Sequence, residues 1–435
     1  MKKLKFSIKS LLKVYIVALL ILQGLLNIRI GGLPNISFPR LLMILCYIWI
    51  LFSSNMQIKF FKAVRQSNDN RFIKLYVLTC LYTALFSADI NAFMGQFIDC
   101  VCLYYLVLFA VEYYFTIDEI VRIITKCLYV VCVAGLIEFF CGFNVFTVLS
   151  MGEPDVILTS YRDGLLRVSG PYGHALAYGM VLLLIFPITC YSNEDNEIDL
   201  FGHPILFFLV TLNVFFTGAR SGIGIYGIEV FSLFVASSKK YKGRNFLAVI
   251  TLIIVIASIA GMFSDLSIVR YSLRQIFYVV DEIFDTNFAL KYGGDASIAA
   301  SSIARERIWL IPFKSTTLNP WLGRGVSNIG TYVINGWKVT SIDNFYVRSY
   351  ISFGIPGILA IMLLFLHFFK ENIKAYLRDR NMGCIVITIS VLCYMINLLY
   401  VDELSTYRYF YFLMAIRCAH INKTKYENPF LGGEN

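Results

Sequence analysis

The most constraining feature of this chain is a succession of long apolar runs joined by polar segments. A helix needs about 20 mostly apolar residues to cross the roughly 30 Å hydrocarbon core of a bilayer. About twelve runs approach that length, at residues 11–28, 38–54, 72–88, 92–114, 123–141, 173–191, 204–217, 222–238, 246–263, 347–369, 383–400 and 406–419. Hydrophobic residues make up 58% of the chain and charged residues 15%. A water-soluble core could not enclose this much apolar surface, which excludes soluble, fibrous and disordered classes. We predict an all-α polytopic integral membrane protein with about twelve transmembrane helices in one domain, residues 1–435.

The placement of lysine and arginine sets the expected orientation. A net charge of +10 could by itself suggest a nucleic-acid partner, but most lysines lie in short loops between apolar runs. Cytoplasmic connections of membrane proteins collect positive charge in this way. With a cytoplasmic N-terminus, the basic loops at residues 59–74, 239–244, 370–380 and 423–425 all face the cytoplasm. We therefore expect both termini to be cytoplasmic, the bilayer to be the immediate environment, and no nucleic-acid partner.

Two segments on the predicted outer side are too long to be simple connections. One covers residues 142–172, and the larger one, between the ninth and tenth predicted spans, covers residues 264–346. Within the larger segment, apolar residues recur at helical spacing from Leu266 to Phe284. This pattern predicts an amphipathic helix lying in the outer membrane interface. A flexible stretch is expected at 292–302, followed by a short helix at 303–313 whose end is bracketed by Pro312 and Pro320.

Arginine gathers on the predicted outer side, although the positive-inside rule disfavours cations there. The residues concerned are Arg162, Arg167, Arg220, Arg270, Arg274, Arg305, Arg307, Arg324 and Arg348. A guanidinium group offers two parallel donors to a phosphate and stays charged at a membrane boundary. The pattern favours an anionic substrate at the outer face. The alternative is that long loops escape the charge rule and that these arginines pair with neighbouring acids such as Asp155 and Glu306.

The segment Thr217-Gly-Ala-Arg220-Ser221-Gly222 joins the seventh and eighth predicted spans with hardly any loop. Small residues allow close backbone approach, and Ser221 is a candidate cap for the next helix. A helix N-terminus beside Arg220 would form an anion pocket. The plainer interpretation is a tight turn with an arginine that reaches towards the interface.

Several other polar residues interrupt the apolar runs. Asp99, Glu138 and Glu229 are expected to face the bundle interior, because a carboxylate in contact with lipid is costly. They are candidate structural partners of outer arginines or catalytic groups, and the structural role is favoured for Asp99 and Glu229. The four histidines have no metal-ligand spacing, so we predict no metal site. His174, at the outer start of the sixth span, remains a candidate functional residue.

Four segments, read in order, resemble the O-antigen ligase and Wzy-type polymerase superfamily of bacterial membrane glycosyltransferases. They are Arg167-Val-Ser-Gly-Pro-Tyr-Gly-His174-Ala-Leu-Ala177; Phe216-Thr-Gly-Ala-Arg220-Ser-Gly222; Arg305-Glu-Arg307-Ile-Trp309 with Asn319-Pro-Trp-Leu-Gly-Arg324-Gly325; and Asp343-Asn344-Phe-Tyr346 with Phe353-Gly-Ile-Pro-Gly357. Each piece is short, and the resemblance depends on their order, spacing and predicted outer placement between residues 167 and 357. About twelve spans with one large outer loop also fit this family.

The resemblance implies transfer of a glycan from a polyprenyl diphosphate donor at the outer face of the bacterial cytoplasmic membrane, without a metal or other cofactor. Arg220 would clamp the diphosphate with help from Arg167 and Arg305, because preplaced donors stabilise the charge that develops on the leaving group. Asp343 would orient or deprotonate the acceptor hydroxyl. The predicted substrate-binding residues are Arg167, His174, Arg307, Arg324, Asn344 and Tyr346. A flippase and a chain-length regulator are the partners expected of such a system.

One departure bears on the type of transferase. Ligases of this superfamily carry histidine before the asparagine of the fourth segment, where this chain has Asp343. We therefore predict a polymerase that joins lipid-linked oligosaccharide repeat units of a surface polysaccharide. Two alternatives stay open: a ligase that transfers finished glycan to a lipid or protein, and a polysaccharide transporter or flippase. Asp99 and Glu229 keep the transporter open, since transporters place charged sites near mid-membrane.

Overall fold

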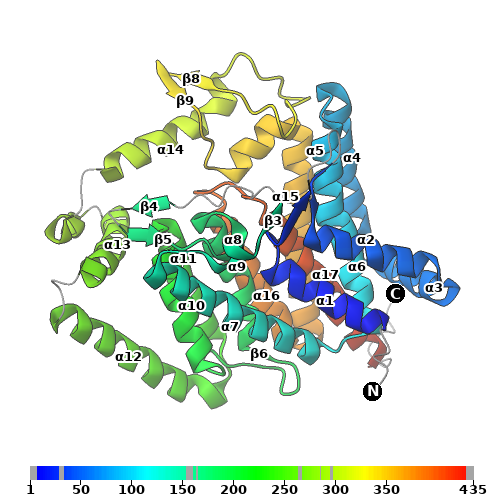
Figure 1. Cartoon of the computed structure of the whole chain (residues 1–435), viewed down its shortest axis with the longest axis horizontal. Coiled ribbons are helices and arrows are strands. Elements are labelled where there is room, and N and C mark those ends of the chain that lie inside the picture. The colour runs from blue at the N-terminus through cyan, green and yellow to red at the C-terminus, as the bar shows by residue number, and fades with distance from the viewer. Residues whose placement is uncertain are drawn as a thin grey trace.

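The computed structural model describes residues 7–28, 34–152, 160–162, 165–262, 267–284, 286–293 and 297–427. The first half contains the helices α1 (Ile8–Ile21), α2 (Phe38–Leu51), α3 (Ser54–Gln66), α4 (Asn70–Ser87), α5 (Ile90–Gln96), the π-helical turn η1 (Phe97–Cys102), α6 (Leu103–Tyr113), α7 (Ile117–Cys141), α8 (Val145–Leu149), η2 (Gly170–Tyr172), α9 (Ala175–Ile185) and η3 (Phe186–Cys190). The second half contains α10 (Pro204–Phe216), α11 (Arg220–Ala236), α12 (Lys239–Met262), α13 (Ser267–Phe284), η4 (Phe288–Tyr292), α14 (Ser297–Lys314), α15 (Phe345–Asp379), α16 (Met382–Asn397) and α17 (Tyr407–Glu427). Helix is thus the main secondary structure (Figure 1).

The strands are short and only trim the helical bundle. They are β1 (Leu26–Ile28), β2 (Ile36–Ser37), β3 (Met151–Gly152), β4 (Ser160–Arg162), β5 (Leu165–Arg167), β6 (Tyr191–Ser192), β7 (Glu197–Ile198), β8 (Tyr332–Ile334) and β9 (Trp337–Val339). β1 pairs antiparallel with β2 and parallel with β3. The pairs β4–β5, β6–β7 and β8–β9 are antiparallel. The β8–β9 hairpin and α14 lie together at one end of the molecule (Figure 1).

Every apolar run predicted as a span coincides with a helix, the fourth with α5, η1 and α6 together. Within the described residues, three helices are long and apolar enough to cross a membrane: Ile90–Tyr113, Ile117–Cys141 and Phe345–Asp379. The pair α2 and α3 qualifies only together, and it bends by 113° at the junction. Shorter apolar helices occupy Ala175–Cys190, Pro204–Phe216 and Met382–Asn397. The chain is therefore a helical membrane protein, while the count of twelve spans stays a prediction.

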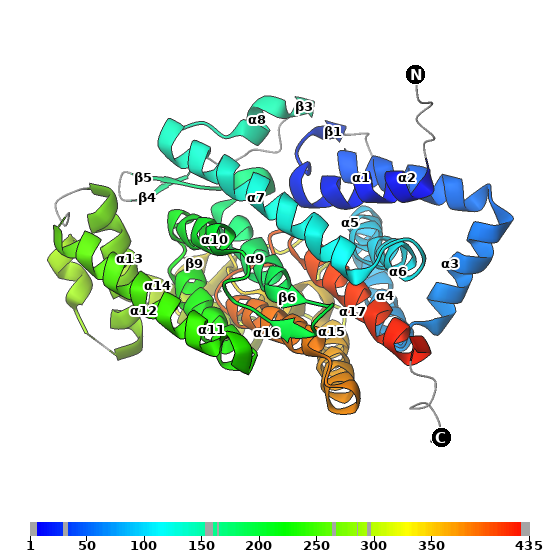
Figure 2. The same cartoon turned by 90° about the horizontal axis from the view of Figure 1, so that it is seen from below.

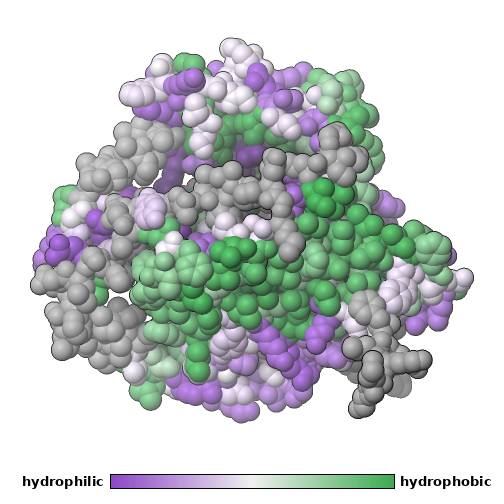
Figure 3. Space-filling model, in the orientation of Figure 1, coloured by the Kyte–Doolittle hydropathy of each residue, from purple (hydrophilic) through white to green (hydrophobic). Residues whose placement is uncertain are grey.

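The surface and interior both fit a lipid environment. Hydrophobic side chains form a band across the face that carries α7 and α10, with hydrophilic side chains on either side of it (Figure 3). Val130 and Val133 of α7 and Phe208 of α10 are about half exposed there, as lipid-facing side chains would be. In the interior, α17 packs against α6, α9, α15 and α16 (Figure 2). Its residues from Phe410 to Ala415 are fully buried.

A docked loop explains why α15 is broken. Gly354 has φ 65° and ψ −167°, a backbone conformation that in practice only glycine adopts. At this break, the amide of Ile355 donates to the carbonyl of Pro320 at 2.7 Å. A Cβ on Gly354 would lie 2.5 Å from that same carbonyl oxygen, and a Cβ on Gly323 would lie 2.4 Å from the carbonyl oxygen of Ser352. Each glycine therefore makes room for the backbone of the other segment.

The large outer segment follows the predicted pattern in part. The amphipathic helix expected at 266–284 is α13, apart from Leu266, which lies outside the described residues. The second helix was expected to begin at Ile303, but α14 begins at Ser297. The expectation of a flexible stretch is therefore wrong for residues 297–302. Alanine and serine tolerate a helix well, and no glycine interrupts this part.

Candidate functional site

The site begins at the turn between α10 and α11, which the sequence placed at residues 217–222. Gly218 adopts φ +60°, and a Cβ there would lie 2.3 Å from the hydroxyl of Tyr271 on α13. The guanidinium Nε of Arg167, at the end of β5, donates to the carbonyl of Thr217 at 2.7 Å. The expected cap by Ser221 is wrong, because Ala219 is the N-cap of α11 and Ser221 lies in its first turn. The turn thus joins β5, α11 and α13 at one point.

Arg220 is the first residue of α11 and is 8% exposed. Its guanidinium carbon lies 3.7 Å from the ring centroid of Tyr278, which is close enough for a strong cation–π contact. Tyr278 and Tyr271 are both buried and both come from α13. The amphipathic helix therefore covers the turn with aromatic rings. Arg220 and Arg167 are brought to the same turn, as the sequence predicted.

His174 is the N-cap of α9, and its Nδ1 accepts the backbone N–H of Leu176 at 3.1 Å. Burial and the nearby charge of Arg167 lower the pKa of His174, and Asp343 opposes them. A ring nitrogen that accepts a hydrogen bond carries no proton, so the neutral ring holds its proton on Nε2. His174 can therefore donate a hydrogen bond to a ligand while its cap is intact, but Nδ1 is not free to take a proton.

Asp343 lies between two parts of the site. Its side chain is exposed, and one oxygen accepts the hydroxyl of Ser341 at 2.7 Å. Its charge raises the pKa of His174 and also that of Asp402. Since an exposed charge acts over only about 10 Å at moderate ionic strength, Asp343 is close to both residues. This carboxylate has the accessibility that a proton acceptor needs.

Asn344 and Tyr346, which were predicted to bind substrate, hold α15 in place. Asn344 is buried and caps α15, accepting the amide of Val347 at 2.9 Å, while its Nδ2 donates to the carbonyl of Leu399 at 2.8 Å. The hydroxyl of Tyr346 donates to the carbonyl of Met395 at 3.0 Å. The polar groups of both side chains thus connect α15 to α16 and the segment that follows it.

The remaining predicted arginines divide into two groups. Arg305 of α14 has its guanidinium carbon 5.2 Å from the ring centroid of Tyr400, in the connection between α16 and α17. This is the same connection that holds Asp402. Arg307 and Arg324 instead lie against the β8–β9 hairpin: the guanidinium carbon of Arg307 is 4.1 Å from the ring of Trp337, and Arg324 stacks near Tyr332. Arg305 therefore faces the Asp343 region, whereas these two arginines support the hairpin.

Sequence reasoning missed a charged pocket next to Asp343. The pocket has a volume of about 410 Å³, and its charged lining residues are Arg40, Asp99, Arg348, Asp402, Glu403 and Arg408. Asp99 accepts two hydrogen bonds from Arg40, at 2.7 and 2.9 Å, and pairs with Arg408 at 3.3 Å. Arg348 pairs with Asp402. Asp99 lies on the π-helical turn η1, a type of distortion that is frequent at functional sites.

Glu403 is the most unusual group in this pocket. Burial and the adjacent Asp402 raise the pKa of Glu403 to about 7, although Arg348 and Arg408 oppose the shift. The next two residues, Leu404 and Ser405, both adopt left-handed backbone conformations, with φ of 44° and 63°. Such strained positions cluster at active sites and ligand clamps. A carboxyl that titrates near neutral pH is suited to proton transfer.

Glu138 and Glu229, the other two carboxylates in apolar runs, differ in their surroundings. Glu138 accepts the amide and the hydroxyl of Ser169, at 3.0 and 2.8 Å, and the amide of Gly170 at 2.9 Å. It therefore fixes the segment that leads from β5 to α9. Glu229 is fully buried in α11, and neither of its oxygens is hydrogen-bonded to any other described residue.

No group of three or more His, Cys, Asp or Glu side chains that could hold a metal occurs in the described parts of the chain. No protein-family model matches this chain, and no curated protein matches it either. The chemistry of the site therefore has to be inferred from the residues themselves.

Proposed function

We propose that this protein is a polymerase that joins lipid-linked oligosaccharide repeat units of a bacterial surface polysaccharide. In this proposal it is a metal-independent glycosyltransferase of the cytoplasmic membrane, and its site faces outward. The observation that carries the proposal is the meeting of Arg167 and Arg220 at the N-terminus of α11, with the titratable carboxyls Asp343 and Glu403 nearby.

The arginines suit a diphosphate. Backbone N–H groups at a helix N-terminus and guanidinium groups both favour anions. In the proposed reaction, an acceptor hydroxyl oxygen attacks C1 of the donor sugar while the bond from C1 to the diphosphate oxygen breaks. The electron pair leaves with the polyprenyl diphosphate, whose growing negative charge Arg220 and Arg167 stabilise in the transition state.

The proton of the acceptor hydroxyl needs an acceptor of its own. Glu403, with its pKa near 7, is about half ionised at neutral pH and can take the proton, and Asp343 orients the hydroxyl. His174 donates from Nε2 to a sugar oxygen or to the diphosphate. Arg305 stands on the same side of the site and neutralises the substrate further.

The test is Arg220→Ala, compared with Arg122→Ala, an exposed arginine near the N-terminus of α7. The purified full-length protein should elongate lipid-linked repeat units in detergent. We expect Arg220→Ala to lower the rate by at least about a hundredfold, since one lost transition-state donor typically costs 10²–10³. The Arg122→Ala rate should equal that of the wild type. Normal elongation by Arg220→Ala would refute the clamp.

A deletion strain separates the polymerase from a ligase. Loss of a polymerase leaves single repeat units on the final acceptor, whereas loss of a ligase leaves long chains on the polyprenyl carrier. A gel of the surface glycan distinguishes the two patterns.

One observation favours the transporter alternative. Glu229 is a buried carboxyl without a hydrogen-bond partner among the described residues, as a proton-coupled carrier could use. Elongation by the purified protein would exclude transport as its sole role.

A further inference from the structure

A second pocket lies at the other end of α15, far from the proposed transferase site. Its volume is about 770 Å³, and it lies between the connection joining α3 to α4 and the C-terminal half of α15. Arg348, in the transferase site, and Lys370, in this pocket, are 22 residues apart on the helix. At 1.5 Å per residue this separation is about 33 Å. That is close to the roughly 30 Å hydrocarbon thickness of a bilayer.

The rim of this pocket is strongly basic. Its lining includes the exposed cations Arg65, Arg71, Lys370 and Lys374, and none of the four forms an ion pair with another described residue. Arg378 also lines the pocket but pairs with its neighbour Asp379. The acidic side chain of the lining is Glu371, which accepts a hydrogen bond from the amide of Asn68 at 3.5 Å. Four unpaired cations therefore face one carboxylate, which leaves a net positive pocket.

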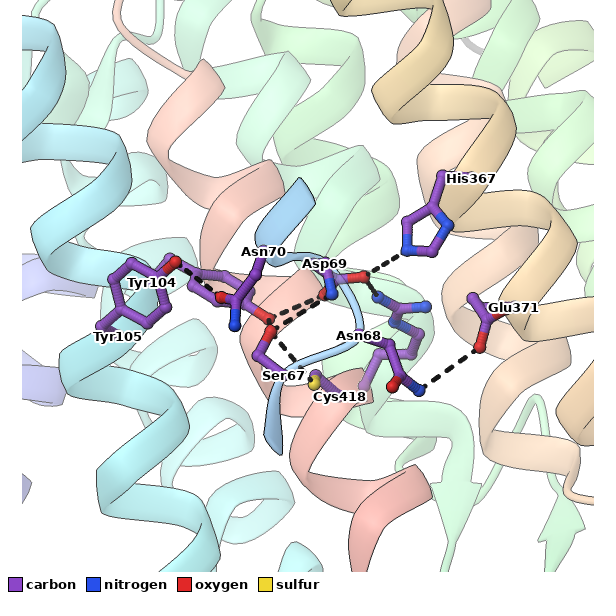
Figure 4. A network of polar contacts seen from close by, with 10 residues as sticks. Ser67, Asn68, Asp69, Asn70, Tyr104, Tyr105, His367, Glu371 and Cys418 are labelled. Carbon is purple, nitrogen blue, oxygen red and sulfur yellow. Dashed lines mark hydrogen bonds and ion pairs between the residues drawn. The ribbon is translucent and has the colours of Figure 1, made fainter. Parts of the chain in front are cut away.

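The floor of the pocket is a rigid, buried polar network (Figure 4). Asp69 is completely buried and accepts hydrogen bonds from His367 at 3.0 Å, from Tyr104 at 2.7 Å and from the buried guanidinium of Arg417. The ring of His367 stacks on Phe72, with centroids 4.2 Å apart. Because this network joins the start of α4 to α15 and α17, it holds the basic side chains of both walls at fixed positions.

The other wall of the pocket is apolar. Phe72, Leu363, Leu366 and Ile421 contribute to the lining. Leu366 is 61% exposed and Leu363 is 41% exposed, and both lie on Phe345–Asp379, one of the helices able to cross a membrane. A basic pocket that continues into an exposed apolar surface matches a molecule with a phosphate at one end and a hydrocarbon chain at the other.

We propose that this pocket binds the phosphate group of an anionic amphiphile at the membrane surface opposite the transferase site. Lys370, Lys374, Arg65 and Arg71 hold the phosphate, and the hydrocarbon chain lies along Leu363 and Leu366. Two sources share this chemistry, an anionic phospholipid and a polyprenyl phosphate. The proposal does not depend on the glycosyl transfer, because it rests on a different set of residues.

The test measures lipid binding to the full-length protein in detergent by native mass spectrometry. The probes are phosphatidylglycerol, a polyprenyl phosphate, phosphatidylcholine and inorganic phosphate. The pocket variant is Lys370→Gln/Lys374→Gln. The control is Lys239→Gln/Lys242→Gln, which removes the same charge from exposed lysines of α12 that do not line the pocket.

We expect one or both of the anionic amphiphiles to bind more tightly than phosphatidylcholine and inorganic phosphate, and the tighter of the two identifies the source. The pocket variant should weaken that binding by about tenfold or more, because each lysine beside an anionic headgroup contributes several-fold. The control should bind as the wild type does. Equal weakening by both variants, or inorganic phosphate binding as tightly as the amphiphiles, would overturn the proposal. The unfolding temperature without lipid shows that both variants are folded, since all four lysines are exposed.

Discussion

The substitution Asp69→Asn tests how the connection between α3 and α4 is held. Asp69 is completely buried, and the guanidinium of Arg417, which pairs with it, is 1% exposed. Burial alone would raise the pKa of Asp69, but Arg417 and hydrogen bonds from His367 and Tyr104 lower it to about 2. The carboxylate therefore stabilises the folded protein only in its charged form. Asparagine keeps the shape of the side chain and removes that charge.

Two estimates give the size of the effect. The pKa falls from 3.8 to about 2, and at about 1.36 kcal/mol per unit this corresponds to roughly 2.5 kcal/mol of pH-linked stability. Breaking a buried pair costs more, about 3–5 kcal/mol, because Arg417 is left without a counter-ion. The second estimate applies to Asp69→Asn, since the first compares two protonation states that both keep a carboxyl oxygen beside Arg417. We expect a loss of about 3–5 kcal/mol in the free energy of unfolding.

A denaturant titration with a thiol-reactive dye measures this loss. Nine of the eleven cysteines are buried, and Cys418 lies 3.8 Å from Ser67, next to Asp69, so unfolding exposes thiols to the dye. Asp343→Asn, which changes an exposed carboxylate, should alter stability by less than about 0.5 kcal/mol. The double variant Asp69→Asn/Arg417→Met should regain much of the loss, because replacing both members of a buried pair is often neutral.

The pH dependence has a defined sign. The folded-state pKa of Asp69 is depressed, so its contribution is complete above the unfolded value near 4 and is lost as the pH falls towards 2. An Asp69→Asn protein as stable as the wild type at neutral pH, within about 1 kcal/mol, would refute the reasoning.

Three further outcomes are expected. Gly354→Ala should destabilise the protein by about 3 kcal/mol or more, because φ is +65° and the new Cβ would lie 2.5 Å from the carbonyl oxygen of Pro320; Gly24→Ala, which has open space around it, is the control in the same titration. Glu403→Gln should remove the rise of the elongation rate with pH that has its midpoint near 7, since only the ionised form accepts a proton; a wild-type profile in this variant would eliminate Glu403 as the base. Glu138→Gln should cost about 1.5–3 kcal/mol of unfolding free energy, because its hydrogen bonds are charge-assisted.

The helices could be predicted from the sequence because apolar runs have a strong and local signature. Each predicted run is helical, and α10 and α11 end and begin within two residues of the predicted bounds. What the runs do not specify is how each helix meets the membrane. The bend of 113° between α2 and α3 depends on where α3 packs in the folded bundle. Tertiary packing of this kind leaves no local pattern.

The pocket around Glu403 could not be predicted for a related reason. Its charged residues come from positions 40, 99, 348 and 402–408, and no spacing rule joins such distant parts of a chain. The available signal was the pair Asp402 and Glu403, which directly follows an apolar run. The pKa of Glu403 depends on Arg348 and Arg408 arriving from two different helices. The fold therefore creates the chemical property, and the residue alone does not carry it.

The docked loop also changes the weight of the segments that resemble glycosyltransferases. Gly323 and Gly354 belong to two of those segments, and their backbones approach each other so closely that neither tolerates a Cβ. Packing alone accounts for both glycines, so they would recur in any protein that breaks α15 against this loop, whatever its chemistry. The glycines therefore favour a shared fold rather than a shared reaction. The proposed chemistry depends instead on residues that packing does not require to be charged, foremost Arg220 and the exposed Asp343.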